Sequence, residues 1–447
     1  MTPDFKLDAG ATAWVLASTA LVLLMTPGLA FFYGGMVRAK HVLGMLMQNF
    51  TTMAVVSVVW VLAAYSLAFD RGNGFVGGLH FAGLQAMTEP VPGFEGDAAQ
   101  VIPPVVFVGF QLMFAVITPA VITGATADRW RYASFVPFIV LWSVLVYAPV
   151  AHWVFSPVGW AARLGTLDFA GGTVVHTNAG AGALAMALLL GRRRGWPEAG
   201  MRPHSLPLVM LGTGLLWFGW FGFNSGSALR ADGLAGVALI NTNTAAAMAL
   251  LAWITLERIR YGKATSLGAA SGVVAGLVAI TPCAGFVSPL GAVAVGAIAG
   301  SVCALAVGIK SWFGIDDSLD VVAVHLIGGI VGSLCVGLFA SRVVNPAGAD
   351  GLFYGGGYRQ LGYQCVAVLA VTVYSLVVTA AIGLFLNRLV GNRVRPREEA
   401  AGLDLSQHGE TAYESGVQPE AVRAWSSTPG SQDGDPAQAD RHGESVR

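Results

Sequence analysis

The sequence predicts an all-α integral membrane protein that crosses the bilayer with eleven transmembrane helices. Of its 447 residues, 55% are hydrophobic and only 11% are charged, whereas soluble domains carry about 25% charged residues. Eleven apolar runs are long enough to span a bilayer as helices, and they are too long for the strands of a membrane barrel. The predicted spans cover residues 11–33, 41–69, 101–127, 132–155, 171–191, 205–229, 235–256, 266–282, 286–310, 320–340 and 361–387.

Composition also argues against several other classes of protein. The formal net charge is zero, so the chain lacks the basic footprint of a nucleic-acid-binding protein. The high hydrophobic content fits neither a soluble globular chain nor a disordered one. The four cysteines form no CxxC pair and lie in or beside apolar runs, which is typical of packing residues. We therefore expect no disulfide framework, no metal site and no cofactor. The cysteines are Cys283, Cys303, Cys335 and Cys365.

The first apolar run and the basic residues predict the topology. The apolar core of a signal peptide has about 7–15 residues, so the longer run at 11–33 is expected to be a mature helix preceded by a short external tail at 1–10. Sixteen of the 25 lysines and arginines lie on one side of the predicted spans, six on the other, and three in the far C-terminal tail. Because cytoplasmic loops carry the excess of basic residues, the N-terminus is predicted outside and the C-terminus in the cytoplasm.

Two histidines at matching positions indicate an internal repeat. His176 and His325 each follow an aspartate by eight residues (Asp168 and Asp317), with apolar residues leading into the histidine. We expect each aspartate to mark a helix start, so that each histidine would lie about 12 Å deeper. A lone histidine on an apolar face is more often a packing residue, but the repeated spacing favours a site at the midplane. The chain then divides into two inverted five-helix repeats plus one extra helix.

The composition changes after the last predicted span. Residues 11–390 form the expected membrane domain. Residues 391–414 form the expected cytoplasmic segment, and within it the mixed stretch at 402–413 is expected to dock against the cytoplasmic face. Residues 415–447 are rich in Ser, Gly, Pro, Gln, Asp and Glu, with few apolar residues. Such a composition predicts a disordered cytoplasmic tail.

Six stretches carry the most specific motifs of the chain: Pro27-Gly-Leu-Ala-Phe-Phe-Tyr-Gly-Gly35, Phe110-Gln-Leu-Met-Phe-Ala-Val-Ile-Thr-Pro-Ala120, Asp168-Phe-Ala-Gly-Gly-Thr-Val-Val-His176, Trp220-Phe-Gly-Phe-Asn-Ser-Gly-Ser227, Asp316-Asp-Ser-Leu-Asp-Val-Val-Ala-Val-His325 and Gly402-Leu-Asp-Leu-Ser-Gln-His-Gly-Glu-Thr-Ala-Tyr413. In this order they resemble the ammonium transporters of the Amt/Mep/Rh family, and within it the Amt branch. The resemblance extends from about residue 11 to 414, and the stretch that ends at His176 is highly specific.

The resemblance implies a multi-pass protein of the cell membrane that carries ammonium and assembles as a homotrimer with one pore in each subunit. It implies an outer vestibule that recruits ammonium, an aromatic gate and a narrow pore lined by twin histidines. It also implies a regulatory segment at 391–414, with a PII signal protein as a candidate partner on the cytoplasmic face. By family match the recruitment residues are Ser227, Phe114, Phe155 and Asp168, the gate residues are Phe114 and Phe223, and the pore residues are His176, His325, Trp220, Phe32 and Phe110.

The residue types alone leave some of these roles open. Phenylalanines such as Phe114 and Phe223 would normally be assigned to helix packing. Asp168 can either attract ammonium or cap a helix N-terminus, and we favour the cap; Asp317 should play the related role in the second half, on the cytoplasmic side. Many relatives carry a tryptophan where this chain has Phe155. Because phenylalanine is the weaker cation–π partner, weaker recruitment is expected.

The predicted pore favours passage of ammonia over passage of an intact ion. Moving an ion into a narrow apolar tube is very costly, and ammonium can avoid that cost by losing its proton, whereas potassium cannot. We therefore expect deprotonation near the gate and a separate transfer of the proton through the same histidines. Two alternatives are an ammonium sensor that signals through its tail and a Rh-type neutral gas channel. An intramembrane enzyme or haem protein is disfavoured, because the chain has no H-E-x-x-H or comparable motif.

Overall fold

The computed structural model describes residues 7–94, 101–197 and 201–413, and the regular secondary structure in these ranges is helical apart from two isolated β-bridges. The predicted tail at 415–447 and most of the predicted tail at 1–10 lie outside the described residues. Among the described residues, ten helices are long and apolar enough to cross a membrane. The chain is therefore a multi-pass membrane protein.

One of the eleven predicted spans is a shorter helix than expected. The predicted span at 266–282 corresponds to α11 (Ser266–Ile280), which is apolar but only 15 residues long. Nearly all of its residues from Gly268 onward are buried. Because its neighbours in the bundle surround it, α11 needs neither the length nor the lipid-facing surface of the other helices.

The first half of the chain contains two spans with an internal π-helical turn and a third that begins with one. These turns are η2, η5 and η6, and each runs directly into the next α-helix. The elements are α1 (Ala9–Met36), η1 (Ala39–His41), α2 (Val42–Val59), η2 (Trp60–Ala64), α3 (Tyr65–Phe69), η3 (Ala82–Leu84), α4 (Pro104–Ile122), α5 (Tyr132–Trp142), η5 (Ser143–Tyr147), α6 (Ala148–Phe155), α7 (Trp160–Leu164), η6 (Gly172–Thr177) and α8 (Asn178–Leu190).

The second half begins with four helices and ends with a span that again starts with a π-helical turn, η7. A single long helix, α15, follows both halves, and two short helices end the described chain. The elements are α9 (Leu206–Gly226), α10 (Gly233–Tyr261), α11, α12 (Pro289–Ala306), α13 (Ile309–Phe313), η7 (Val322–Ile327), α14 (Gly328–Phe339), η8 (Leu352–Tyr354), α15 (Arg359–Leu389), α16 (Pro396–Ala401) and α17 (Leu403–His408).

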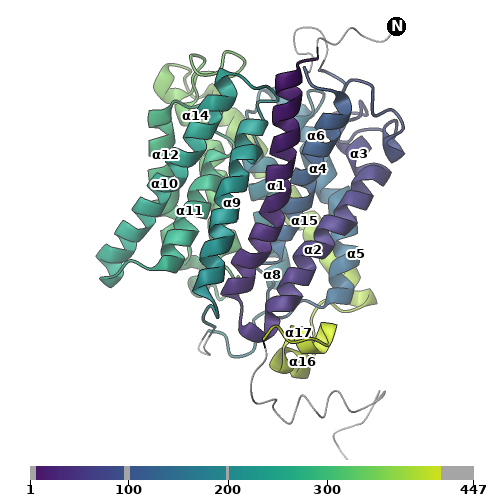
Figure 1. The fold of residues 1–447 in the computed structure, drawn as a ribbon, viewed down its shortest axis with the longest axis vertical. Helices are drawn as coiled ribbons and strands as arrows, with labels where there is room; N and C mark the ends of the chain where they lie inside the picture. The colour runs from purple at the N-terminus through teal and green to yellow at the C-terminus, as the bar shows by residue number, and fades with distance from the viewer. Residues whose placement is uncertain (1–6, 95–100, 198–200, 414–447) are drawn as a thin grey trace, which may run out of the picture.

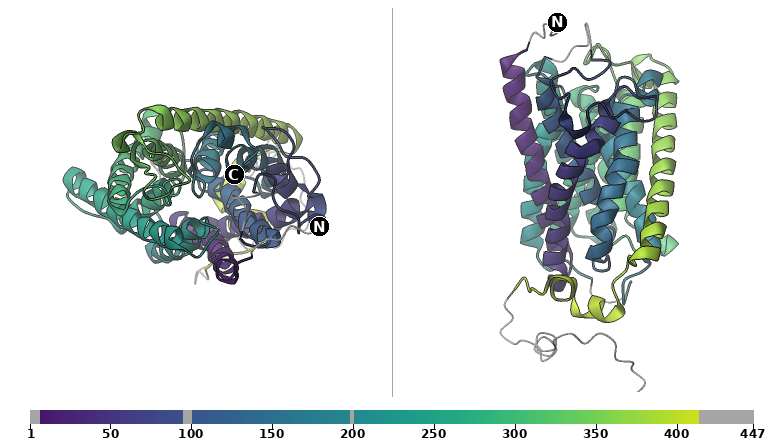
Figure 2. Two further views of the ribbon diagram at one scale, coloured as in Figure 1. Left: turned by 90° about the horizontal axis from the view of Figure 1, so that it is seen from above. Right: turned by 90° about the vertical axis from the view of Figure 1, so that its right-hand side faces the viewer.

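The helices form one elongated bundle in which the two halves lie side by side (Figure 1). The first helices of the two halves, α1 and α9, pack along each other, and α10, α11 and α12 form a second close group. Helix α15 lies along the outside of the bundle (Figure 2), where it contacts α5, α8 and α14. Close packing inside the second half depends on glycine: a Cβ on Gly276 would lie 2.5 Å from the carbonyl oxygen of Ala245 in α10.

The C-terminal segment docks beneath α2, at the end of the bundle opposite the start of α1 (Figure 1). Asp404 Oδ1 accepts a hydrogen bond of 2.8 Å from the N–H of Gly44 in the first turn of α2. The Leu403 N–H donates to His41 Nδ1 at 3.2 Å, and Lys40 Nζ donates to the carbonyl of Ala400. The segment therefore holds the α1–α2 connection through three separate hydrogen bonds.

Candidate functional site

The aspartate of the first half caps the helix that carries His176. Asp168 Oδ1 accepts the N–H groups of Gly171 and Gly172, both at 2.8 Å, and Oδ2 accepts those of Thr173 and Val174 at 2.8 and 3.3 Å. Four donors at the start of a helix have no partner within the helix, and this carboxylate satisfies them. Burial raises the pKa of Asp168, while these N–H groups act in the opposite direction. All four acceptor positions of the carboxylate are thus occupied by backbone.

The second half uses the same device at the opposite end of the bundle. Asp317 accepts the N–H groups of Val321 at 3.1 Å and Val322 at 2.7 Å, and burial raises the pKa of its carboxyl group. Three residues after each aspartate the backbone turns left-handed, with φ of +117° at Gly171 and +62° at Asp320. That turn brings the carboxylate back over the N–H groups of the helix that follows.

This geometry corrects the predicted depth of the histidines along their helices. The helices begin at Gly172 and Val322, four and five residues after the aspartates. His176 is therefore four residues into its helix and His325 only three, rather than eight. The first turns are also π-helical: the His176 N–H bonds the Gly171 carbonyl at 3.2 Å. The residues next to each aspartate form a non-helical turn because the left-handed position ends any helix there.

The two halves meet through contacts that the repeat relates to each other. A Cβ on Gly180 would lie 2.6 Å from the Cα of Leu326, and a Cβ on Gly329 would lie 2.8 Å from the Thr177 hydroxyl oxygen. Gly180 and Gly329 are 149 residues apart, and so are Thr177 and Leu326. The two histidines are separated by the same 149 residues. The twin histidines thus lie where the two π-helical turns cross.

The imidazoles of His176 and His325 face each other with the same ring atom. Their Nδ1 atoms are 3.2 Å apart, so one ring donates and the other accepts, and the pair holds one shared proton. Both side chains are buried, and His176 Nε2 has no hydrogen-bond partner. Reversing the direction of the shared bond requires a proton to arrive at one Nε2 and leave from the other. The pair can therefore act as a proton relay.

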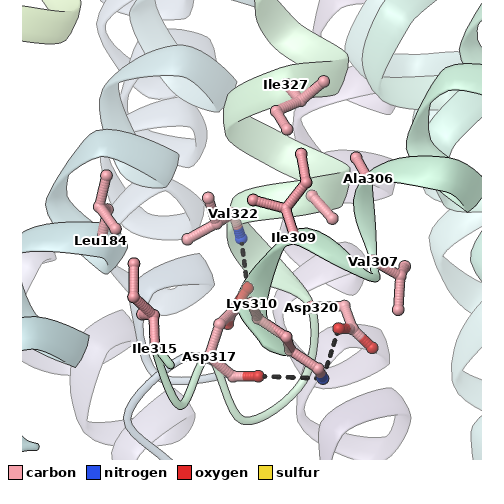
Figure 3. Close-up of a pocket in the computed structure, with 11 residues that line it drawn as sticks. Leu184, Ala306, Val307, Ile309, Lys310, Ile315, Asp317, Asp320, Val322 and Ile327 are labelled. Atoms are coloured by element: carbon pink, nitrogen blue, oxygen red, sulfur yellow. Dashed lines mark hydrogen bonds and ion pairs between the residues drawn. The ribbon is translucent and has the colours of Figure 1, made fainter. Parts of the chain in front are cut away.

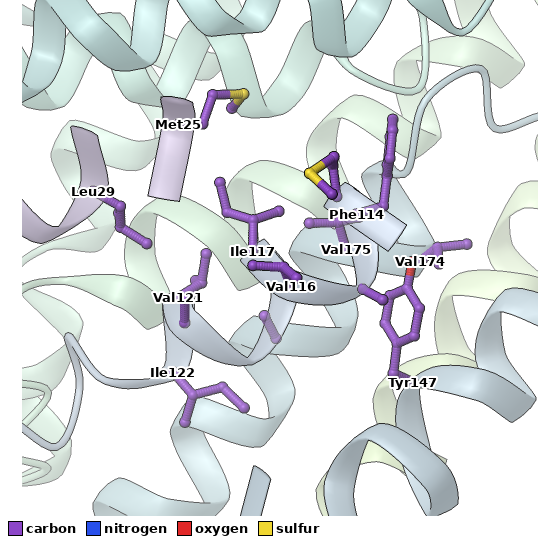
Figure 4. Packing of buried hydrophobic residues seen from close by; sticks show 14 of the residues in the cluster. Met25, Leu29, Phe114, Val116, Ile117, Val121, Ile122, Tyr147, Val174 and Val175 are labelled. Atoms are coloured by element: carbon purple, nitrogen blue, oxygen red, sulfur yellow. The ribbon is translucent and has the colours of Figure 1, made fainter. Parts of the chain in front are cut away.

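Apolar side chains surround the histidine pair. The cavity beside the two imidazoles is narrow, with a volume of about 10 Å³ open to a water-sized molecule. Figure 4 shows four of its lining side chains, Met25, Leu29, Ile117 and Val121, within the packed hydrophobic core. The indole of Trp220 stacks on His176 with ring centres 5.3 Å apart and planes inclined by 21°. The lining residues are Met25, Leu29, Ile117, Val121, Val175, His176, Leu216, Trp220, Phe223, Val274 and His325.

An aromatic pair separates this cavity from a wider pocket beside Asp168, which we call the vestibule. The rings of Phe114 and Phe223 lie 4.2 Å apart, and Phe155 meets Phe114 edge-on at 6.3 Å. The Ser227 hydroxyl donates to the Phe223 carbonyl at 2.8 Å, so its lone pairs remain available to accept a donor from the vestibule. The vestibule has a volume of about 210 Å³ and is lined by Phe94, Phe107, Gln111, Phe114, Val154, Phe155, Asp168, Phe169, Ser227 and Leu229.

The structure places two predicted pore aromatics away from both cavities. Phe110 is fully buried, and its ring packs against that of Phe114 with ring centres 4.9 Å apart. Phe32 is buried with its ring 5.7 Å from that of Tyr33. Neither ring lines the cavity at the histidines. Trp153, two residues before Phe155, donates to the Phe75 carbonyl and lies outside the vestibule.

A further pocket lies where the second half begins its π-helical turn. Lys310 Nζ is 2.6 Å from Asp320 Oδ1 and 3.3 Å from the Asp317 carbonyl oxygen, as Figure 3 shows. The neighbouring Asp316 binds Arg193, which follows the far end of α8, through hydrogen bonds of 2.8 and 2.9 Å. Although burial opposes it, Arg193 holds the pKa of Asp316 below its usual range. Asp168 caps the start of η6–α8, whereas the start of η7, which Asp317 caps, lies beside the other end of α8.

Sequence reasoning missed several residues at this site. Gln111 lines the vestibule, and Thr281 accepts the indole N–H of Trp220 at 2.9 Å. Gln111 follows Phe110 inside a motif already singled out, so its position was available as a signal, but nothing in the local sequence of Thr281 connects it to Trp220. Within the described ranges, no group of three or more His, Cys, Asp or Glu side chains is placed to hold a metal ion.

Comparisons of the sequence with known proteins all point to one family. Residues 13–413 match the Ammonium Transporter Family. The chain is 50% identical to an ammonium transporter of Mycobacterium bovis over 92% of this chain and 91% of that protein. It is 49% identical to an ammonium transporter of Bacillus subtilis, over 91% and 99%.

Solved structures show the same similarity in three dimensions. Mep2 of Saccharomyces cerevisiae superposes with a TM-score of 0.80 at 37% identity, covering 88% of this chain and 92% of that one. A structure titled Sensor Amt Protein superposes with a TM-score of 0.81 at 30% identity, covering 89% and 98%.

Proposed function

Because the chain belongs to the ammonium transporter family, we propose that it moves ammonium across the membrane as ammonia and a separate proton. The observation that carries this proposal is the histidine pair: two buried imidazoles joined Nδ1 to Nδ1 at 3.2 Å beside an apolar cavity. An ion would lose its hydration there without replacement, whereas ammonia is neutral. The imidazoles supply the only ionisable side chains among the residues that line this cavity.

Recruitment would take place in the outer vestibule. Phe114 and Phe155 offer aromatic faces to a cation, each of which supplies roughly 1–2 kcal/mol when desolvated. Ser227 supplies a directional acceptor for an ammonium N–H, which favours ammonium over a spherical ion of similar size. Asp168 contributes negative potential from the vestibule wall, but its oxygens already hold four backbone donors. It would therefore act on ammonium at a distance.

Deprotonation would occur where the vestibule ends. The closely packed rings of Phe114 and Phe223 admit no hydrated ion past them unless they move. Ammonium that gives up its proton at this gate continues as ammonia along the cavity. The proton reaches His176 Nε2, the shared Nδ1 bond reverses, and a proton leaves from His325 Nε2. The relay then returns to its starting state when the His176 hydrogen moves back to Nδ1 and the His325 hydrogen moves back to Nε2.

Topology and assembly follow from the family and from charge. We infer that the N-terminus is outside and the C-terminus inside, which the excess of basic residues on one side supports. The docked segment α16–α17 would then lie in the cytoplasm, where a PII signal protein would reach it. We also infer a homotrimer with one pore in each subunit, as the resemblance implies.

The test is the ammonium-pulse current across a solid-supported membrane that carries purified protein. Wild type should give a current, and His176→Ala and His325→Ala should abolish it. A parallel pH assay in liposomes follows ammonia itself. A wild type that equilibrates ammonia without any current would contradict the proton relay and identify a neutral gas channel instead.

A sensor is the second candidate, and one specific observation favours it. A solved structure titled Sensor Amt Protein has the same fold at 30% identity, and in the present chain the C-terminal segment is docked on the α1–α2 connection. Ammonium binding without transport in both assays would support this reading. Transport at ordinary rates would reject it as the main role.

A further inference from the structure

The indole N–H of Trp220 is buried and has one partner, the hydroxyl of Thr281. Trp220 Nε1 lies 2.9 Å from Thr281 Oγ1, and the Thr281 hydroxyl donates its own hydrogen to the Leu277 carbonyl at 2.7 Å. Because a hydroxyl carries a single hydrogen, the direction of both bonds is fixed. Thr281 follows the last residue of α11, whereas Trp220 belongs to α9. The bond therefore ties the position of the indole to another helix.

The ring held in this way is the one that covers His176. The indole and imidazole planes are inclined by only 21°, and Phe223 of the gate lies 5.6 Å from Trp220. In this stacked arrangement the indole N–H points away in the plane of its ring, toward Thr281. It cannot donate to the imidazole beneath it.

The imidazole beneath the indole carries an unpaired acceptor. His176 Nε2 is buried without a hydrogen-bond partner, and the two ring centres are 5.3 Å apart, so an indole released from Thr281 could turn its N–H toward that nitrogen. That bond would require an unprotonated Nε2, and the hydrogen of His176 would then stay on Nδ1. The shared Nδ1 bond could no longer reverse, since reversal needs a proton on Nε2 of His176.

We propose that Thr281 is a positioning residue of the transport path, which keeps the Trp220 N–H away from His176 so that the histidine pair remains free to exchange protons. The inference rests on the proposed function and adds a residue that no motif identified. It also assigns Trp220 a role beyond lining the pore: its ring face covers His176 while its polar edge is held elsewhere.

The experiment compares two substitutions at one position. Thr281→Val keeps the shape of the side chain and removes the hydroxyl, whereas Thr281→Ser keeps the hydroxyl. Ammonium-pulse current and ammonia equilibration are measured on the same liposome preparations. We expect Thr281→Val to lower the current at least tenfold and ammonia equilibration less than threefold, and Thr281→Ser to stay within twofold of wild type in both.

A matched control separates this role from helix packing. Thr213 in α9 is buried and donates to the Val209 carbonyl at 2.8 Å, as Thr281 does to Leu277, but no indole depends on it. Thr213→Val should therefore retain its current. The proposal is overturned if Thr281→Val conducts like wild type, or if Thr281→Ser loses as much current as Thr281→Val. A wild type without current would instead reject the proton relay itself, so the two failures are distinguishable.

A double variant covers the case in which Thr281→Val does not fold. Trp220→Phe removes the N–H that needs a partner. In that background the Thr281 hydroxyl has nothing to accept, so Trp220→Phe/Thr281→Val should fold and conduct like Trp220→Phe alone. A double variant that conducts much less than Trp220→Phe would show that Thr281 acts by another route and would overturn the proposal.

Discussion

Replacing Asp168 by asparagine should destabilise the protein, because the carboxylate is a helix cap. The amide oxygen of asparagine can keep one pair of backbone donors, such as Gly171 and Gly172. The amide nitrogen would then face the N–H groups of Thr173 and Val174, which lie 2.8 and 3.3 Å from the present Oδ2. Two buried donors without an acceptor cost about 1–3 kcal/mol each, which gives about 2–6 kcal/mol in total.

The buried thiols of the protein offer a direct assay. Cys283, Cys303 and Cys335 are buried and free, and Cys365 is exposed. In a Cys365→Ser background, a thiol-reactive fluorescent dye reports the temperature at which the bundle opens. Asp168→Asn should lower that temperature by several degrees.

Asp232→Asn is the matched control. Asp232 caps α10 with a single oxygen, Oδ1, which accepts both Leu234 and Ala235. Its asparagine variant can keep both bonds, so its opening temperature should change little. If Asp168→Asn instead opened at the wild-type temperature while its half-saturating ammonium concentration rose tenfold, the capping argument would be wrong and a direct role in recruitment would replace it.

Three further predictions follow from the same geometry. Phe155→Trp should lower the half-saturating ammonium concentration two- to fivefold, since an indole strengthens a cation–π contact by about 0.5–1 kcal/mol; an unchanged or higher value in the current assay would count against recruitment at this ring. Gly180→Ala should abolish the current, because its Cβ would force α8 away from Leu326 in the π-helical turn η7, while Gly362→Ala, whose Cβ meets nothing within 4 Å, should conduct normally. Arg193 lowers the pKa of Asp316, so this ion pair stabilises the folded protein at neutral pH, and the stabilisation is lost as pH falls below about 4. Asp316→Asn should therefore open at a lower temperature than wild type at pH 7, and its opening temperature should fall less than that of wild type on acidification. Parallel profiles of opening temperature against pH for the two proteins would contradict this.

The sequence by itself determined the membrane class, most of the spans and the two histidines. Runs of apolar residues of this length can satisfy their backbone in lipid only as helices, so the approximate limits of most spans can be read from the sequence. The equal spacing from Asp168 to His176 and from Asp317 to His325 is likewise a property of the sequence. It predicted that the halves are related, because two such costly residues at the same offset indicate an internal repeat.

Only the tertiary structure decided how these residues act together. The left-handed turns at Gly171 and Asp320 shorten the helices that carry the histidines; the second turn could not be foreseen, because an aspartate rarely adopts that conformation. The bond from Trp220 to Thr281 joins residues 61 positions apart, and no local pattern encodes such a pairing. The succession of apolar helical spans follows from the needs of the backbone in lipid, so the sequence shows it. The partner of a buried polar group instead depends on which helices the whole chain brings together.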